Sequence, residues 1–425
     1  MSMKKSNFIF HRSHNRDILL KNFFYLSVLQ VMRYLIPILV LPYISRVIGV
    51  VYFGQIAITS SVAMIMQIVV DYGYNFIGAR DVARNKQNLN FITNLYSTIT
   101  IARCFLFLIC CVVVLILTFF LPFLAEVRLL LFINCQCVFL SIFMPEWLYQ
   151  GLEEMKFITI INVISRIIYV ILIFLVVREQ DDYILYPVVN NIGLLGAGVA
   201  SYIILQKRNI VLRIINWQEI LQMLKNGWNL FINNLCGGMM GYILSMFIGY
   251  FLSFRDAGIY SSSSRLISAA NHALGIISRV FFPFLSQNIS KHTKFFILNM
   301  IIGFGVMTFT FVFTPFIFNL FYPSEFSDGI LIMRIMSINI FFSCINNSLS
   351  SNFLILQGKE VLVRNMGFIN LLIGSICFLF AIKFYGLIGA AIISVIISMI
   401  NTVIFGYFTI KIKREMNPYT NVFGI

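Results

Sequence analysis

The stretch Cys104–Ala125, CFLFLICCVVVLILTFFLPFLA, contains no charged residue. A helix needs about 20 apolar residues to cross a hydrocarbon core about 30 Å thick, and this stretch is long enough. The rest of the chain has the same character: of 425 residues, 60% are hydrophobic and 11% are charged, and the mean hydropathy is +0.90. A soluble domain has roughly 45–50% apolar and about 25% charged residues. The composition therefore excludes a soluble domain, a disordered chain and a disulfide scaffold, and predicts an integral membrane protein.

Helices rather than a barrel are expected to cross the membrane. Only helices and closed barrels satisfy their own backbone hydrogen bonds in lipid, and barrel strands alternate apolar and polar residues over about ten positions. Residues 226–254, 295–324 and 384–410 are continuous uncharged runs without that alternation. The expected fold is an all-α bundle.

The cysteines predict neither a disulfide framework nor a metal site. All eight lie in apolar stretches, without a CxxC pair or a histidine at ligand spacing, so they are expected to be small buried hydrophobic residues. Neither a cofactor nor a metal is expected. The polar, basic segment Met1–Lys21 lacks a small-residue cleavage site, which predicts a cytoplasmic tail before an uncleaved first helix.

Charged and turn-rich stretches divide the chain into twelve predicted spans. Their approximate limits are 20–44, 52–77, 91–120, 128–149, 157–177, 183–205, 224–252, 258–286, 295–320, 329–355, 363–382 and 387–410. With the N-terminus inside, the cytoplasmic segments hold 20 Lys and Arg residues and the opposite loops hold five. This bias predicts that both termini are cytoplasmic and accounts for much of the net charge of +15, which therefore does not indicate a nucleic-acid surface.

Short internal matches indicate two halves of six spans. Leu20-Lys21-Asn22 recurs as Leu224-Lys225-Asn226, Gly54 recurs as Gly258 at the same offset, and Gln150–Glu153 resembles Gln357–Glu360. Because six spans restore the orientation, the halves are expected to be parallel repeats related by an axis along the membrane normal. The predicted organisation is an N-terminal lobe over 1–206, a cytoplasmic interfacial linker over 207–223, and a C-terminal lobe with a cytoplasmic tail over 224–425.

The span 258–286 carries the sharpest polar signal. Arg265, His272 and Arg279 are spaced by seven residues, and Ser261 and Ser268 extend the same helical stripe over roughly 21 Å from Arg265 to Arg279. A charge at mid-membrane costs on the order of 2.5–3.5 kcal/mol, so ionisable residues there usually have a function. One interpretation is a basic rail that lines a water-filled lumen and meets an anion. The alternative is that the two arginines snorkel toward opposite interfaces while His272 packs among neighbours.

Two charged residues in the first two spans are also candidates. Arg33 lies near mid-span, which favours a lumen-facing role; the alternative is an ion pair with Asp71. Asp71 shares a face with Gln67 and Asn75, and it either carries a coupling proton or cation or only neutralises an arginine. The other clear intramembrane acid is Glu146.

Neutral polar residues form two further stripes. Asn229 and Asn233, with Asn226, lie on one face of the seventh span and could bind hydroxyl-rich groups, whereas Gly237 and Gly241 fit close helix packing. In the tenth span, the residues Asn339, Ser343, Asn346 and Ser350 form a stripe that either lines a cavity or joins helices. Structural roles are at least as well supported for the remaining intramembrane arginines, which are Arg103, Arg166 and Arg334.

Several motifs resemble a known family. Leu41–Gly49 (LPYISRVIG), Tyr52-Phe53-Gly54 and Val70–Asn75 (VDYGYN) resemble the opening of Wzx-type O-antigen and polysaccharide flippases. Further similarities lie in Ala79–Ala83, in Trp147–Glu153 (WLYQGLE) and from Gly258 through Pro283. These motifs point to the polysaccharide-transport branch of the multidrug/oligosaccharidyl-lipid/polysaccharide exporter superfamily.

The resemblance implies a function and a set of partners. It implies twelve helices in two six-helix lobes around a central cavity, and transfer of an undecaprenyl-pyrophosphate-linked oligosaccharide across the inner membrane by alternating access. The family's arginine-lined lumen carries over to Arg33, Arg265 and Arg279, and Asp71 falls within a matched motif. The implied partners are the lipid-linked oligosaccharide, membrane lipid, a proton or sodium counter-ion and the polysaccharide polymerase machinery.

Two other functions remain open at this point. A multidrug exporter would favour an acidic, aromatic cavity, whereas the predicted spans contain six arginines and only two clear acids. A lipid-linked polysaccharide polymerase would be expected to have a sizeable periplasmic loop, and every predicted outer loop is short. No Walker loop is present, so ATP hydrolysis is not expected.

Overall fold

A computed structural model describes residues 3–416. The side chains of residues 3–20, 23, 34, 236, 237 and 416 lie outside the described part, as do residues 1–2 and 417–425. The predicted roles of the basic N-terminal tail, of Cys236 and Gly237, and of the end of the C-terminal tail therefore fall outside the described residues.

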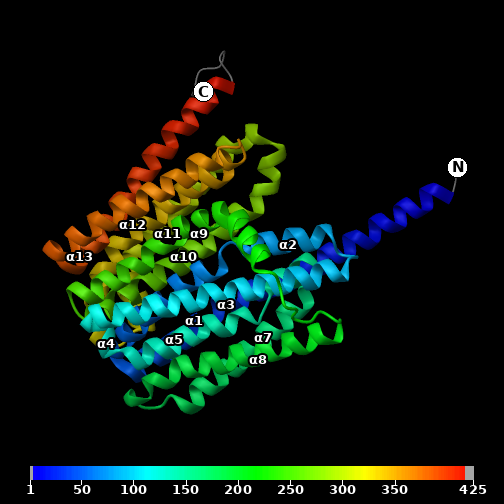
Figure 1. Ribbon diagram of the computed structural model, residues 1–425. Coiled ribbons are helices and arrows are strands. Elements are labelled where there is room, and N and C mark those ends of the chain that lie inside the picture. The colour runs from blue at the N-terminus through cyan, green and yellow to red at the C-terminus, as the bar shows by residue number, and fades with distance from the viewer. Residues whose placement is uncertain (1–2, 417–425) are drawn as a thin grey trace. The chain divides into compact units, whose positions relative to one another are not determined.

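The described residues form helices and contain no strand (Figure 1). The α-helices are α1 (Met3–Asp71), α2 (Tyr74–Arg84), α3 (Leu89–Phe120), α4 (Pro122–Glu126), α5 (Arg128–Ile142), α6 (Glu146–Gly151), α7 (Met155–Val176), α8 (Leu185–Lys207), α9 (Trp217–Phe251), α10 (Phe254–Gln287), α11 (His292–Phe321), α12 (Gly329–Leu349) and α13 (Glu360–Met416). Short 3-10 turns precede α8, α11 and α12, and a π-helical segment, Ser350–Ile355, follows α12. The predicted all-α membrane fold is confirmed.

Two long helices each contain two predicted spans joined at a glycine kink. In α1 the backbone breaks at Gly49 (φ 72°, ψ 175°), between the first and second predicted spans. In α13 it breaks at Gly386 (φ 58°, ψ −142°), between the eleventh and twelfth. Glycine populates positive φ at little cost because it lacks a Cβ, so both positions suit a sharp change of direction.

Among the described residues, length and composition identify eight helices able to cross a membrane, or nine when the bent pair Trp217–Leu235 and Gly238–Phe251 is taken as one span. Two of the eight, Phe24–Arg84 and Glu360–Glu415, have 61 and 56 residues. At about 1.5 Å per residue, each is long enough for two crossings. The helix α10 is not among the eight, although it has 34 residues. The total of twelve crossings stays a prediction.

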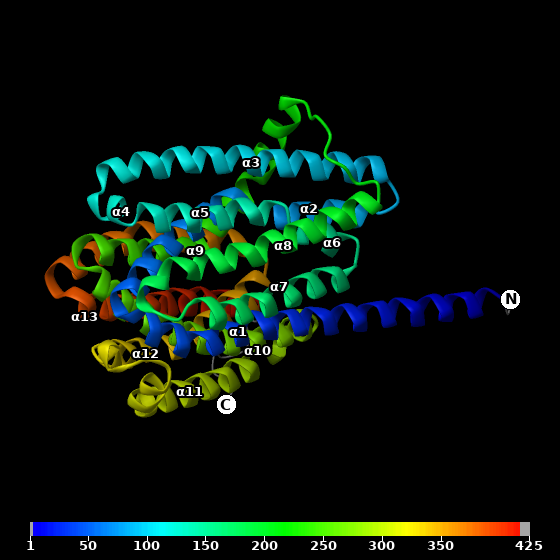
Figure 2. The same cartoon turned by 90° about the horizontal axis from the view of Figure 1, so that it is seen from below.

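The chain forms two compact units. The first contains residues 1–48 and 62–235, and the second contains 49–61 and 236–425. In the first, α8 packs against α5 and α7, and α3 packs against α5 (Figure 2). In the second, α12 packs against α10, α11 and α13. Residues 208–216 connect α8 to α9 without helix, and the predicted lobe boundaries and the interfacial position of this linker stay predictions.

The WLYQGLE motif has a packing role in the first unit, where α6 packs against α2. A Cβ added to Gly78 would overlap the indole ring of Trp147, and one added to Gly151 would lie 2.6 Å from the Cβ of Val82. The Tyr149 side chain is fully buried, and its hydroxyl lies 2.8 Å from the Ser201 hydroxyl. The motif therefore joins α6 closely to its neighbours.

The repeated glycines Gly54 and Gly258 lie against each other in the second unit. A Cβ on Gly54 would overlap the carbonyl oxygen of Phe254 and lie 2.8 Å from the Gly258 nitrogen. A Cβ on Gly258 would overlap the carbonyl oxygen of Val50. Two segments of backbone approach here so closely that neither position accommodates a side chain.

We expect Gly54→Ala and Gly258→Ala each to lower the thermal unfolding temperature of the purified protein. Overpacking of a tight contact typically costs about 1–3 kcal/mol. Gly305→Ala in α11 is the matched control, because an added Cβ there meets nothing within 4 Å. Equal unfolding temperatures for all three variants would contradict the inferred close contact.

Candidate functional site

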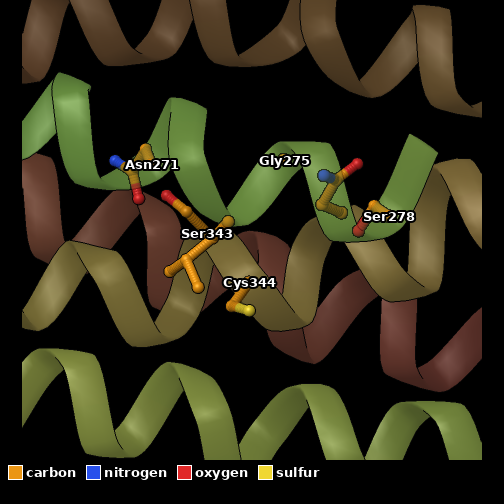
Figure 3. Close-up of a pocket in the computed structure, with 7 residues that line it drawn as sticks. Asn271, Gly275, Ser278, Ser343 and Cys344 are labelled. Atoms are coloured by element: carbon orange, nitrogen blue, oxygen red, sulfur yellow. The ribbon is translucent and has the colours of Figure 1, made fainter. Parts of the chain in front are cut away.

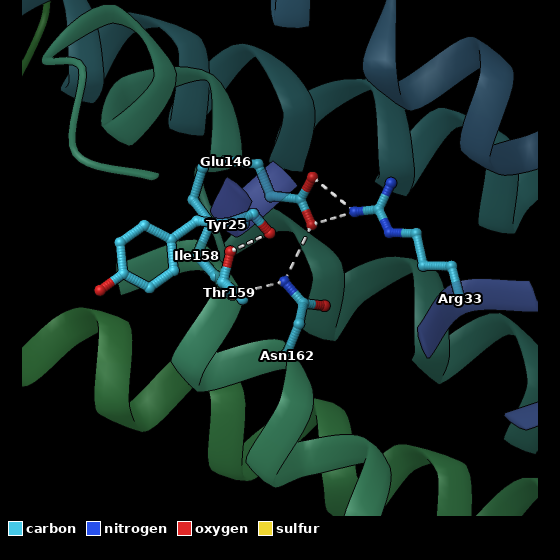
Figure 4. Close-up of polar contacts among 6 residues, drawn as sticks. All are labelled: Tyr25, Arg33, Glu146, Ile158, Thr159 and Asn162. Carbon is cyan, nitrogen blue, oxygen red and sulfur yellow. Dashed lines mark hydrogen bonds and ion pairs between the residues drawn. The ribbon is translucent and has the colours of Figure 1, made fainter. Parts of the chain in front are cut away.

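Arg33 forms an ion pair with Glu146 in the first unit (Figure 4). One guanidinium nitrogen, Nη2, lies 2.6 Å from Oε1 and 2.8 Å from Oε2 of the carboxylate. The amide Nδ2 of Asn162 donates to Oε1 at 3.2 Å. Both charged side chains are partly exposed, by 36% for Arg33 and 27% for Glu146. The pair is thus assembled from α1, the first residue of α6, and α7, and a ligand can compete for it.

Asp71 pairs with Arg103 instead of Arg33. The alternative pairing of Arg33 with Asp71 was wrong because Asp71 ends α1 and lies beside Arg103 of α3, while the start of α6 brings Glu146 to Arg33. Arg103 is 4% exposed, so Asp71 neutralises a buried cation. This contact agrees with the structural interpretation of Arg103 and supports a neutralising role for Asp71.

The α10 stripe has a different electrostatic environment. The Nε of Arg265 lies 3.4 Å from the Ser261 hydroxyl, and its guanidinium lies 4.9 Å from the ring centroid of Phe53. His272 and Arg279 are exposed, and Arg265 is half-buried. Within the described part of the chain, no carboxylate lies within 4.0 Å of the guanidinium nitrogens of Arg265 or Arg279. Arg265 thus contacts a hydroxyl and an aromatic ring rather than an acid.

The two asparagine stripes differ. Asn229 and Asn233 are exposed on α9 and remain candidates for contact with hydroxyl groups. In α12, by contrast, the amide of Asn339 donates to the Ser394 hydroxyl at 2.8 Å and that of Asn346 donates to the Ser398 carbonyl at 3.0 Å. The helix-joining interpretation is therefore confirmed for Asn339 and Asn346.

The second unit contains a pocket, and of its lining residues only Ser343 belongs to a stripe for which a cavity was one of the predicted alternatives. The pocket has a volume of about 230 Å³ and lies between α10 and α12 (Figure 3). The lining residues are Asn271, Leu274, Gly275, Ser278, Ser343, Cys344 and Asn347. The lining residues of α10 have the spacing i, i+3, i+4 and i+7, which places them on one face of the helix. This face differs from the one that carries the stripe of charged residues.

The predicted site residues are divided between the units. Arg33, Asp71, Asn229 and Asn233 belong to the first, and Arg265, His272 and Arg279 belong to the second. No group of three His, Cys, Asp or Glu side chains able to hold a metal occurs among the described residues.

We expect Asp71→Asn to destabilise the protein more than Arg103→Leu, because the first leaves a buried cation unpaired and the second leaves a more exposed carboxylate. Breaking one partner of a buried pair typically costs about 3–5 kcal/mol. The double variant Asp71→Asn/Arg103→Leu is expected to recover most of the loss in thermal unfolding experiments. Losses that add in the double variant would show that the two side chains are not coupled.

Comparison with known proteins agrees with the motif resemblance. A "Putative O-antigen transporter" from Shigella dysenteriae is 25% identical over 400 residues, which cover 92% of this chain and 100% of that protein. A protein of the same name from Escherichia coli K12 is 21% identical over 276 residues, or 65% of this chain and 66% of that protein.

Two solved structures share the fold. The "Lipid II flippase MurJ, inward closed conformation" has a TM-score of 0.68 at 13% identity, with 92% of this chain and 87% of that chain covered. An inward-facing multidrug resistance MATE family transporter of the MOP superfamily has a TM-score of 0.59 at 14% identity, with 86% and 89% covered. The model of the family described as "Polysaccharide biosynthesis protein" matches residues 19–289. The chain therefore belongs to the polysaccharide biosynthesis protein family.

Proposed function

We propose that this protein is a flippase that moves an undecaprenyl-pyrophosphate-linked oligosaccharide repeat unit from the cytoplasmic to the periplasmic leaflet of the bacterial inner membrane. The proposed movement is alternating access coupled to a proton or sodium gradient, with both termini in the cytoplasm. Membership of the polysaccharide biosynthesis protein family and similarity to two proteins named putative O-antigen transporters support this class of cargo.

The observation that carries the proposal is a difference among the intramembrane arginines. Some of them contact a carboxylate, and others do not. In the first unit, Arg33 and Arg103 each contact a carboxylate, whereas Arg166 has none within ion-pair distance among the described residues. In the second, Arg265 and Arg279 have no carboxylate within ion-pair distance among the described residues. Arginines without an acidic partner on a membrane helix favour an anionic ligand, since guanidinium groups form bidentate, charge-assisted hydrogen bonds with phosphate oxygens.

The same pattern disfavours a cationic cargo. A site for cationic drugs needs an available carboxylate, and both intramembrane acids, Asp71 and Glu146, already contact arginine. In the proposed mechanism Arg265 and Arg33 hold the pyrophosphate, His272 and Arg279 extend the basic rail along α10, and Asn229 and Asn233 meet sugar hydroxyls. The polyprenyl tail stays in lipid while the head group passes.

Arg33 and Asp71 are both ion-paired, and their proposed roles depend on the partial exposure of these two side chains. The Arg33–Glu146 pair is partly exposed, so a phosphate can exchange with the Glu146 carboxylate. Asp71 is the proposed coupling residue because its side chain remains 23% exposed while it contacts the buried Arg103.

We expect Arg265→Ala and Arg279→Ala each to reduce transfer of the lipid-linked intermediate at least tenfold, with accumulation on the inner leaflet. The measurement is a leaflet-resolved assay of that intermediate in cells with matched protein abundance. Arg255→Ala is the control on the same helix, because Arg255 is an exposed residue that pairs with Asp328 at 2.9 Å.

Three outcomes would contradict the proposal. Normal transfer in both variants would remove the arginines from the mechanism. Accumulation of single repeat units on the outer leaflet would indicate a polymerase, and extrusion of cationic dyes by the intact protein would indicate a drug exporter.

We expect Glu146→Gln to strengthen binding of undecaprenyl pyrophosphate several-fold and Arg33→Ala to weaken it. The first change removes the competing negative charge and keeps a hydrogen-bonding group beside Asn162. Binding to the purified protein in nanodiscs is the measurement. An unchanged affinity in a folded Glu146→Gln variant would show that Arg33 does not contact the phosphate.

A further inference from the structure

The pocket between α10 and α12 is lined by neutral polar groups without any charged side chain. Asn271 and Asn347 provide two amides, and Ser278 and Ser343 provide two hydroxyls. Each amide has two donors and a carbonyl acceptor, and each hydroxyl both donates and accepts. Leu274, Gly275 and Cys344 supply apolar surface between these groups.

The amides that line the pocket are not engaged in helix packing. The Oδ1 of Asn271 is buried without a hydrogen-bond partner in the described structure. The side chains of Ser343 and Asn347, which are partly exposed, form no hydrogen bond to any described residue, whereas the amide nitrogens of Asn339 and Asn346 on the same helix bond to α13. A buried polar group without a partner costs free energy, so Oδ1 of Asn271 needs water or a ligand.

The wall of the pocket is held by contacts outside it. Asn352, from the π-helical segment, is fully buried and donates to the backbone carbonyl of Ser278 at 2.9 Å. The Cys344 thiol lies 3.1 Å from Oδ1 of Asn299. These bonds join α10 to the π-helical segment and α12 to α11 without using the amides of Asn271 and Asn347.

Size and chemistry exclude a bare cation as the main occupant. A volume of about 230 Å³ is several times the roughly 30 Å³ of one liquid water. A bound cation would also favour a carboxylate, which the lining lacks. A neutral ring with hydroxyl edges and apolar C–H faces matches both the donor and acceptor set and the apolar patches.

The pocket borders the basic stripe of α10. Gly275 follows His272 by three residues and precedes Arg279 by four, so all three lie on adjoining parts of the helix surface. Four residues of helix rise only about 6 Å. A group joined covalently to an anion at Arg279 would thus lie within reach of Gly275.

We propose that this pocket binds a neutral sugar ring of the cargo, the one joined to the pyrophosphate, and that Asn271 and Asn347 recognise its hydroxyl groups. The proposal rests on the proposed function for the source of the sugar. It adds a saccharide specificity site in the second unit that is separate from the arginines.

The test is a blocking variant at Gly275. A Cβ added there meets nothing within 4 Å, so Gly275→Leu extends into the pocket without a backbone clash. Gly305→Leu is the matched control, because Gly305 lies on α11, does not line the pocket and also has open space. Asn271→Leu and Asn347→Leu provide a second test, since they remove the amides at nearly constant size.

Binding to the full chain in nanodiscs is measured with three probes. They are the host's lipid-linked oligosaccharide, undecaprenyl pyrophosphate without sugar, and the free oligosaccharide released from the first. Gly275→Leu and Asn347→Leu are expected to weaken binding of the two sugar-bearing probes at least tenfold and to leave the sugar-free lipid unchanged. Arg265→Ala is expected to weaken both lipid probes.

The outcomes separate this proposal from the proposed function. If the sugar-bearing probes bind Gly275→Leu and Asn347→Leu as they bind the parent protein, the pocket is not a saccharide site, whatever the arginine variants show. If neither lipid probe binds the parent protein while the free oligosaccharide binds in a Gly275-dependent way, the pocket stands and the flippase assignment falls. An equal loss for the sugar-free lipid would assign the pocket to the lipid or phosphate and overturn the proposal.

Discussion

Charge at membrane depth is the constraint on which the arrangement of this protein depends. An ionised side chain in hydrocarbon is costly unless it contacts an opposite charge, reaches an interface or meets water. Two arginines of the first unit use opposite charge, as Glu146 contacts Arg33 and Asp71 contacts Arg103. The second unit leaves Arg265 beside a hydroxyl and an aromatic ring, with no acid at ion-pair distance in the described structure.

This difference gives the two units different chemistry. A neutralised arginine contributes mainly to structure until its partner is displaced, whereas an arginine held by a ring and a hydroxyl is already available to an anion. The same logic applies to the asparagines. Those of α12 that bond to α13 join helices, whereas Asn271 and Asn347 line the pocket between α10 and α12.

Close packing supports these polar features. The contact of Gly54 with Gly258 brings two backbones together in the second unit, and the contact of Gly78 with Trp147 joins α2 to α6 in the first. Since Glu146 immediately precedes Trp147, the packing of that indole also positions the carboxylate that meets Arg33. The motif that resembles a family signature thus has a structural role next to a functional candidate.

Membrane insertion and helical structure could be predicted from the chain alone, because the length of an apolar run and the absence of strand alternation are local properties. The kinks at Gly49 and Gly386 fall between predicted spans for the same reason. The number and limits of the crossings stay predictions. Charge pairing could not be predicted: Arg33 and Glu146 are 113 residues apart, and both acids were equally plausible partners by charge. Periodicity placed Arg265, His272 and Arg279 on one stripe, but it could not separate the asparagines that join helices from those that line a pocket. That distinction depends on which neighbouring helix each amide meets, and only packing in three dimensions determines it.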